Sequence, residues 1–269
     1  MADLTEKQIE RRYAEGRGQG ELSSYRPFID HHDLSSLGRA SRVPSRKTGR
    51  THHFFSDVET SAFLELIRMP EVVDVREQFP LDREDTRAIA AEMGVDHPKY
   101  RNGVDTVMTT DLLVLVSAGS ETIRYARAGK RVADLSDART LEKLEIERRY
   151  WQRRGVHWSL VTELDRSDAC VVALSWMHGM EELPENGHPA YWTDRIAAFR
   201  AEFAKARDMS LEDLDRKLVK HGFQAGEMLN VLRHLAWHGQ LSFDLDQEFN
   251  FRWPTSRFVL TSSARRSAA

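Results

Sequence analysis

The segment that most constrains the fold is the apolar run VMTTDLLVLV, which covers residues 107–116. Its density of branched apolar residues is typical of a buried β-strand, and the run TIRYARAGK at 122–130 has the pattern of a partner strand. The intervening SAGSE contains glycine and is short enough for a tight turn, so the two runs predict a β-hairpin. A chain with this hairpin is expected to build a domain around a β-sheet.

Helical and strand-like segments surround the hairpin. A helix is expected from Ser56 to just before Pro70, and a second one closes at Gly94. A Val-rich run lies between them, and a long helix that Gly155 stops follows the hairpin. The expected helices cover 56–69, 85–93 and 138–153, and the expected additional strands cover 71–81 and 157–164. This order predicts an α/β domain whose central sheet is covered by helices.

The pattern changes after Asp168, where helical segments separated by loops replace the strands. We therefore expect two domains, residues 1–168 and residues 169–269, with residues 1–50 forming an N-terminal arm and a basic loop. The second domain contains helical patterns at 190–206, 209–222 and 224–239, followed by an alternating aromatic segment at 241–260 that suits a β-hairpin. Three helices and such a wing predict a mainly α winged-helix domain.

The overall composition excludes several classes of protein. With 41% hydrophobic and 30% charged residues, the chain has the composition of a soluble globular protein. No apolar run approaches the roughly 20 residues that a membrane span needs, and the N-terminus lacks the apolar stretch of a secretory signal. Cys170, the single cysteine, has no intrachain partner for a disulfide or a thiolate zinc site. We expect a cytoplasmic protein without a membrane partner.

Charge points to nucleic acid only locally. The net charge of -3 argues against a protein that coats nucleic acid non-specifically. Between Ser35 and Arg50, however, five basic residues occur without an acidic one, among Ser, Gly and Pro, which predicts a flexible loop that contacts the phosphate backbone. These DNA-contact candidates are Arg39, Arg42, Arg46, Lys47 and Arg50. On charge alone, a solvated loop that happens to be basic is an equal alternative.

Three residues form the candidate catalytic set. Asp111 lies inside the strong strand, where an ionised carboxylate needs a compensating partner such as a metal ion. Lys130 ends the partner strand, so Asp111 and Lys130 are able to reach the same edge of the sheet, and Glu59 begins the preceding helix. Carboxylates and a backbone carbonyl hold Mg²⁺, or Mn²⁺ as a substitute, and such a cation activates water for phosphodiester hydrolysis. A lysine orients that water or neutralises developing charge.

Each of these residues has a simpler interpretation. Ser56 and Glu59 have the spacing of a helix capping box, which alone accounts for a glutamate in the first turn. Asp111 alone is also explained as a turn cap, and Lys130 alone as a solvated strand end. The capping and catalytic interpretations of Glu59 are compatible, because a capped helix presents the same carboxylate.

Five segments, taken in order, resemble the TnsA endonuclease family of transposons. They are GRTHHFFSDVE, PEVVDVREQFPL, VMTTDLLV, GKRVADL and TLEKLEIERRYWQRRGVHWSLVTE, and the resemblance covers roughly Tyr25 to Glu163, with a weaker one beyond. The resemblance implies a restriction-endonuclease-like fold, in which helices flank a central mixed sheet. It also implies that these residues form the active site: Glu59 is the catalytic acidic residue, Asp111 binds the metal and Lys130 is the catalytic lysine. A helix with the EKLEIERRYW pattern packs beside the active site in that family, so a supporting role is expected for Glu142, Glu145 and Glu147. Their simpler interpretation is pairing at helical spacing with Lys143, Arg148 and Arg149.

The same resemblance implies a function. It predicts a Mg²⁺-dependent endonuclease that nicks the 5′ strands at transposon ends during cut-and-paste transposition. Its partners would be transposon-end DNA, a TnsB-like transposase and a TnsC-like AAA ATPase that regulates the reaction. A restriction enzyme of the host that acts alone is less compatible with the modest net charge, which gives little autonomous affinity for DNA.

One departure from the family pattern concerns the metal. The restriction-like pattern often has Glu or Gln two residues before the lysine, and here that position is Ala128. The backbone carbonyl of Gly129 remains as a metal ligand beside Glu59 and Asp111. The departure motivates a second hypothesis, in which a nuclease fold with weak or lost activity serves as an adaptor that binds DNA and the transposition partners. The intact catalytic set argues against it.

Overall fold

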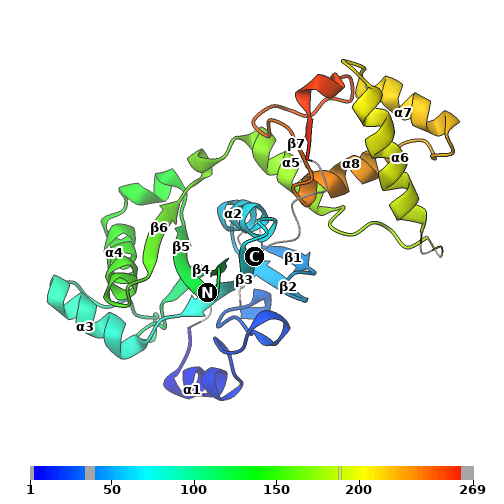
Figure 1. Ribbon diagram of the computed structural model, residues 1–269. Coiled ribbons are helices and arrows are strands. Elements are labelled where there is room, and N and C mark those ends of the chain that lie inside the picture. The colour runs from blue at the N-terminus through cyan, green and yellow to red at the C-terminus, as the bar shows by residue number, and fades with distance from the viewer. Residues whose placement is uncertain (1–2, 34–39, 187, 189, 262–269) are drawn as a thin grey trace. The chain divides into compact units, whose positions relative to one another are not determined.

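The chain folds into two compact units, Met1–Asp165 and Arg166–Ala269, which are described separately. A computed structural model describes residues 3–33, 40–186, 188 and 190–261 (Figure 1). No helix in these described segments is long and apolar enough to cross a membrane.

A mixed sheet forms the centre of unit 1. Its strands are β3 (Val72–Pro80), β4 (Thr109–Ala118), β5 (Glu121–Gly129) and β6 (His157–Val161), in the order β3-β4-β5-β6. β4 pairs antiparallel with both β3 and β5, whereas β6 runs parallel to β5. The predicted hairpin is present, with Gly119 at φ 67° in its turn, a conformation that favours glycine. The expected α/β fold with a mixed central sheet is confirmed.

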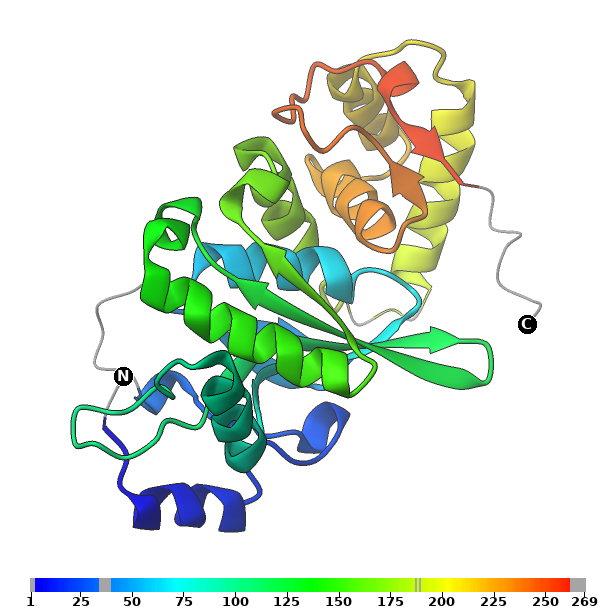
Figure 2. The same cartoon turned by 90° about the vertical axis from the view of Figure 1, so that its left-hand side faces the viewer.

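Helices cover both faces of this sheet. α4 (Ala138–Arg153) lies on one face and α2 (Asp57–Ile67) on the other, as the two views in Figures 1 and 2 show. α3 (Arg83–Met93) packs beside α4. Because the sheet is covered on both sides, the sequence of β4 is a nearly continuous apolar run. This explains why Asp111 stands out in the sequence.

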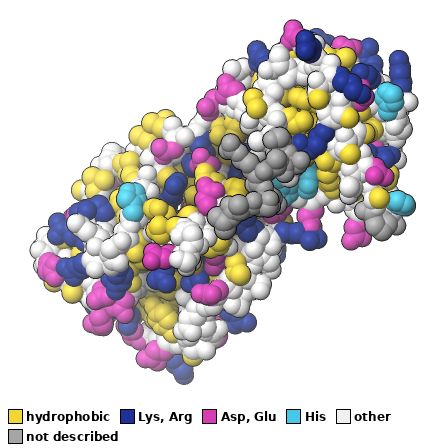
Figure 3. All heavy atoms as spheres, in the orientation of Figure 1, with side chains coloured by type: hydrophobic (Ala, Val, Ile, Leu, Met, Phe, Trp, Pro, Cys, Tyr) yellow, Lys and Arg dark blue, Asp and Glu magenta, His cyan; other side chains and the backbone are white. Residues whose placement is uncertain are grey.

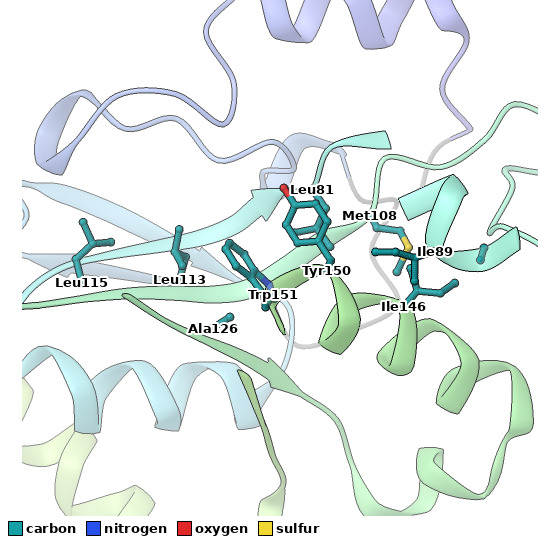
Figure 4. Close-up of a cluster of buried hydrophobic side chains, with 10 residues drawn as sticks. Leu81, Ile89, Met108, Leu113, Leu115, Ala126, Ile146, Tyr150 and Trp151 are labelled. Carbon is teal, nitrogen blue, oxygen red and sulfur yellow. The ribbon is translucent and has the colours of Figure 1, made fainter. Parts of the chain in front are cut away.

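The core between the sheet and α4 is built around aromatic side chains (Figure 4). Tyr150 and Trp151 pack against Leu81, Leu113 and Ile146 with less than a tenth of their surfaces exposed. Burying side chains of this kind contributes roughly 1.5–3 kcal/mol each. The polar ends of the two rings are also satisfied: Trp151 Nε1 donates to Thr110 Oγ1 at 2.6 Å, and Tyr150 Oη accepts from the Asp82 amide at 3.2 Å. These contacts fix α4 along the sheet.

The N-terminal segment is part of the core, so the prediction of an arm over residues 1–50 is wrong for the described residues of that range. α1 (Glu6–Ala14) begins at a Thr5 capping box and buries Ile9. Ile9 joins Phe28 and Ile29 in a cluster with Tyr100, which lies in the loop after α3. The sequence did not reveal this packing because the segment buries few residues and their partners are distant in the chain.

Residues 41–54 form a β-hairpin, called the basic hairpin below, where the sequence suggested a flexible loop. β1 (Ser41–Ser45) and β2 (Arg50–Phe54) pair antiparallel, with Ser41 opposite Phe54. Alternate residues point inward and are buried, among them Val43 and His52. The basic side chains between them hid this period-2 pattern.

A buried ionic network joins the basic hairpin to β3. Arg50 Nη1 donates to Glu77 Oε1 at 2.6 Å, and His52 Nδ1 lies 2.8 Å from Glu77 Oε2. Burial raises the pKa of Glu77, but the charges and hydrogen bonds of His52 and Arg50 outweigh it and lower that pKa to about 2. The network anchors the hairpin next to the strand that carries Gln78.

Unit 2 is mainly helical. Its helices are α5 (Asp168–His178), α6 (Tyr191–Lys205), α7 (Leu211–Lys220) and α8 (Glu227–Trp237), and its strands are β7 (Leu241–Ser242) and β8 (Val259–Leu260). The sequence did not predict α5, because its apolar run lacks a clear helical period. A winged-helix assignment for this unit remains a prediction.

The β-hairpin or wing expected at 241–260 is present only as a short antiparallel ladder at the two ends of that range. Only two residue pairs form its ladder, between Leu241–Ser242 and Val259–Leu260. Between them the chain forms a loop in which Phe243, Phe249 and Trp253 contact one another. The carbonyls of Phe251 and Trp253 accept hydrogen bonds from the first amides of α7, so the loop satisfies a helix end. The aromatic residues thus pack with one another and do not alternate along a strand.

Candidate active site

A cleft of about 760 Å³ in unit 1 brings the predicted catalytic residues together. α2, β3, β4 and α4 contribute to its walls, together with the loop that precedes β4. The side chains that line the cleft include three carboxyl groups, one amide and one ammonium group: those of Glu59, Asp111, Glu147, Gln78 and Lys130. Glu59, Asp111 and Lys130 were predicted from the sequence. Glu147 was one of three helix glutamates expected only to support them, and Gln78 was not anticipated.

Glu59 takes part in the cap of α2 and also lines the cleft. It lies in the first turn of α2, where its amide donates to the Oγ of the N-cap residue Ser56 at 3.1 Å. Its carboxylate accepts from Ser56 Oγ at 2.8 Å and from the Phe55 amide at 3.2 Å. Burial, and then the charge of Asp111, raise the pKa of Glu59 to about 7. The helix cap therefore holds a carboxylate that faces the cleft.

Asp111 and Lys130 are in direct contact. Asp111 Oδ2 accepts from the Gly129 amide at 2.8 Å and lies 3.3 Å from Lys130 Nζ. Lys130 Nζ also donates to the Gly129 carbonyl at 2.7 Å, and the charge of Asp111 raises the pKa of Lys130. The ammonium thus contacts two of the oxygens that the sequence assigned to a metal.

Gly129 allows α2 to approach the end of β5. A Cβ atom built at this position would lie 3.3 Å from Glu59 Cγ and 3.4 Å from Val58 Cγ1, which is tighter than most real contacts. A larger residue would require the Glu59 side chain to shift by a few tenths of an ångström. This close approach explains the glycine between Ala128 and Lys130.

Gln78 connects the two carboxylates. Its Nε2 donates to Asp111 Oδ1 at 3.1 Å and makes a longer contact of 3.4 Å with Glu59 Oε2. Thr109 Oγ1 lies 2.9 Å from the carboxamide oxygen on the other side. No local sequence signal marks this residue, because a glutamine in a strand is inconspicuous until the pairing register is known.

Glu147 lies behind Asp111 on α4. It is buried, and Thr110 Oγ1 donates to its Oε1 at 2.8 Å. Burial, followed by the charge of Asp111, raises the pKa of Glu147 to about 7. Its neighbour Glu145 faces solvent and pairs with Arg148 and Arg149, as the helical spacing predicted. Glu147 is therefore the helix residue whose carboxyl group belongs to the cleft.

The donor set suits a hard divalent cation. Glu59 and Asp111 offer carboxylate oxygens beside the Gly129 carbonyl, and Lys130 is the one ammonium in contact with them among the described residues. Oxygen ligands of this kind favour Mg²⁺ or Mn²⁺. Within the described segments no three His, Cys, Asp or Glu side chains converge as a metal-binding group. The carboxylates alone therefore make an incomplete ligand set.

The predicted DNA contacts have different environments. Arg39 lies outside the described residues. Arg42 and Arg46 are exposed on the basic hairpin, and Lys47 Nζ donates to the Met69 carbonyl at 2.6 Å. We remove Arg50 from the set, because only 8% of its side chain is exposed and it forms the ion pair with Glu77.

Further cations line the cleft itself. Lys99 and Arg101 come from the loop after α3, and Lys143 comes from α4. Lys99 and Lys143 are exposed, whereas Arg101 forms an ion pair with Asp3. Their separation in the sequence hid this grouping. On the face that Figure 3 shows, Lys and Arg side chains of unit 1 are interspersed with Asp and Glu. The cations near the carboxylates thus form a small basic group within a surface of mixed charge.

Comparison with known proteins points to one family. Residues 69–163 match the family described as TnsA-like endonuclease N terminal, a range that contains Gln78, Asp111, Lys130 and Glu147. The transposition protein TnsA of transposon Tn7 from Escherichia coli is 35% identical over 257 residues. This similarity spans 92% of the present chain and 89% of that protein.

Proposed function

The chain belongs to the TnsA family of transposon endonucleases, and from this premise we propose that it is a metal-dependent endodeoxyribonuclease acting at transposon ends. The observation that carries the metal-dependent chemistry is the convergence of Glu59, Asp111 and Lys130 in one cleft of unit 1. Two carboxylates and a lysine in such proximity suit hydrolysis of a phosphodiester better than recognition of DNA alone.

Each residue of the candidate active site has its own role in the proposed hydrolysis. A divalent cation, when bound, supplies Lewis acidity and lowers the pKa of a coordinated water. Glu59, Asp111 and the Gly129 carbonyl would hold it, and the Ser56 cap keeps the Glu59 carboxylate oriented. Lys130 orients the attacking water or neutralises charge on the phosphate. Lys99 and Lys143 hold the substrate strand at the rim of the cleft through its phosphates.

Membership of the family supports the substrate and partners that we propose. We propose that the chain nicks the 5′ strands at transposon ends during cut-and-paste transposition in the cytoplasm. It would act with a TnsB-like transposase and a TnsC-like AAA ATPase. The relative in Escherichia coli is named as a transposition protein of Tn7, which supports a multi-protein transposition system.

Metal dependence and strand choice are tested together in a reconstituted reaction. The chain, its transposase and its ATPase are combined with end-labelled transposon-end DNA. We expect nicks in the 5′ strands with Mg²⁺ or Mn²⁺, and their loss with EDTA, because the carboxylates alone do not activate water. Full cleavage in EDTA would reject the metal-dependent mechanism, and nicks confined to the 3′ strands would reject the strand assignment.

An adaptor role is the second candidate, and Ala128 is the observation that favours it. This fully buried side chain offers no donor or acceptor where related nucleases often have Glu or Gln. An adaptor would still be required for transposition, but the reconstituted reaction would show no nick attributable to this chain. The same assay therefore separates the two functions.

The basic hairpin is expected to contribute to DNA affinity. Replacing Arg42, Arg46 and Lys47 together by Gln should weaken binding to duplex DNA. The slope of log affinity against log salt should fall by about 0.9 for each phosphate that the variant no longer neutralises. Fluorescence anisotropy at several salt concentrations measures both effects.

The matched control for this experiment is Arg148→Gln. Arg148 pairs with Glu145 on α4 and does not line the cleft, so its loss should leave the salt slope unchanged. If the triple variant keeps the salt slope of the unsubstituted protein, the hairpin makes no phosphate contact.

A further inference from the structure

Asp111 has one neighbour on each side in the sheet, and only one of them is polar. Between β3 and β4, Glu77 pairs with Leu112 and Phe79 with Thr110, so Gln78 lies opposite Asp111. Between β4 and β5, Leu112 pairs with Arg127, and continuing this register places Ala128 opposite Asp111 on the other side. Directly opposed residues in antiparallel strands project to the same face. Gln78 therefore stands across Asp111 from the position where related nucleases often carry Glu or Gln.

The backbone at Gln78 is strained. Its φ is 46°, a left-handed conformation that costs free energy for a residue with a side chain. The conformation interrupts the ladder, and the Gln78 carbonyl accepts a hydrogen bond from the Phe28 amide at 3.2 Å. The side chain is nevertheless ordered by three polar contacts, and only 4% of the residue is exposed. Strain of this kind persists where the surrounding structure enforces it, and it concentrates at functional sites.

We propose that Gln78 is a ligand of the divalent cation and supplies from β3 the side-chain oxygen that Ala128 does not supply from β5. This inference rests on the proposed metal-dependent nuclease. Within the described residues, no third acidic, histidine or cysteine side chain joins Glu59 and Asp111 as a metal-binding group. Glu147 is directed to Thr110 by its hydrogen bond. Among the described residues, Gln78 is the remaining oxygen-bearing side chain with a hydrogen bond to each of the two carboxylates.

The carboxamide is suited to both states of the site. Without the cation, its Nε2 donates to the two carboxylates while its Oε1 lies beside the Thr109 hydroxyl. Half a turn of the amide group exchanges these atoms, so that the oxygen faces the carboxylates and the nitrogen faces Thr109. A hydroxyl both donates and accepts, so the Thr109 contact is kept in either orientation. A glutamine at this place therefore stabilises the carboxylates alone and also completes an oxygen ligand set.

Binding of Mn²⁺ to the purified full chain tests the proposal without DNA or partners. Free Mn²⁺ is measured by electron paramagnetic resonance for the unsubstituted protein, Gln78→Leu and Gln78→Glu. Leucine fills a similar volume without oxygen, and glutamate keeps an oxygen at the same position. We expect Gln78→Leu to weaken Mn²⁺ binding at least about tenfold. Gln78→Glu should bind at least as tightly as the unsubstituted protein.

Two further variants make the result specific. Gln152→Leu changes the same side chain on the exposed surface of α4, outside the cleft, and should leave Mn²⁺ binding unchanged. The double variant Gln78→Leu with Ala128→Gln moves the amide to the opposite side of Asp111 and should recover much of the affinity. Circular dichroism confirms that each variant compared is folded.

Several outcomes would overturn the inference. A folded Gln78→Leu protein that binds Mn²⁺ normally, while Asp111→Asn loses binding, would reject Gln78 as a ligand and leave the nuclease proposal intact. Weak binding by Gln78→Glu as well would show that the amide serves only as a donor to the carboxylates. A folded double variant without recovery would reject the equivalence of the two positions. If the unsubstituted chain binds no Mn²⁺, both this inference and the metal-dependent mechanism fail.

Discussion

Asp111→Ala is expected to abolish strand cleavage by the assembled transposition proteins, with a loss of at least roughly a thousandfold, or about 4 kcal/mol. The substitution removes a proposed metal ligand, and it also leaves Lys130 and the Gly129 amide without the oxygen that both contact. The measurement is the rate of nicking of end-labelled transposon-end DNA in Mg²⁺.

The interpretation requires a folded protein with intact partner binding. The substitution changes only the side chain of Asp111 and leaves the backbone pairs of β4 with β3 and β5 in place, so the sheet should stay intact. Asp96→Ala, at an exposed position of the same unit outside the cleft lining, is the matched control and should cleave normally. Undiminished cleavage by a folded Asp111→Ala protein that still assembles with its partners would refute the proposed active site.

Lys130→Ala is expected to lower cleavage roughly a hundredfold or more while metal binding persists. Lys130 Nζ donates to Asp111 Oδ2 and to the Gly129 carbonyl, so its removal exposes oxygens that are proposed ligands. Mn²⁺ affinity should therefore stay the same or increase. The cleavage rate and Mn²⁺ binding are measured on the same preparation.

The control for Lys130 is another lysine of unit 1. Lys7 is exposed on α1, and Lys7→Ala should change neither quantity. A Lys130→Ala protein that loses Mn²⁺ binding together with cleavage would show that the ammonium maintains the metal site itself. The assignment of Lys130 to the water or the phosphate would then be wrong.

Local sequence patterns were sufficient for the parts of the fold that depend on neighbouring residues. The β4–β5 hairpin followed from one apolar run, a partner-strand pattern and a glycine turn, and α4 followed from its helical period and terminal glycine. The Ser56 cap of α2 also followed from its spacing to Glu59. For the site, position within these elements and the family resemblance together selected Glu59, Asp111 and Lys130.

The remaining features depend on pairing between distant segments. The position of Gln78 in the site becomes apparent only from the β3–β4 register, which places it opposite Asp111. Arg50 was taken for a DNA contact because its partner Glu77 lies 27 residues away and is invisible to local charge patterns. In unit 2 the aromatic residues at 243–258 alternate like a strand, yet their contacts with one another favour a loop.

The cap of α2 has a consequence for the dynamics of the enzyme. The Glu59 amide donates to Ser56 Oγ, and Ser56 Oγ in turn donates to the Glu59 carboxylate, so helix initiation and carboxylate orientation depend on the same hydroxyl. Local opening of the first turn of α2 releases the amide to solvent and moves the carboxylate away from Asp111 in one event. Amide hydrogen exchange at Glu59 therefore measures the fraction of molecules in which the proposed catalytic residues are separated, even while the sheet stays folded.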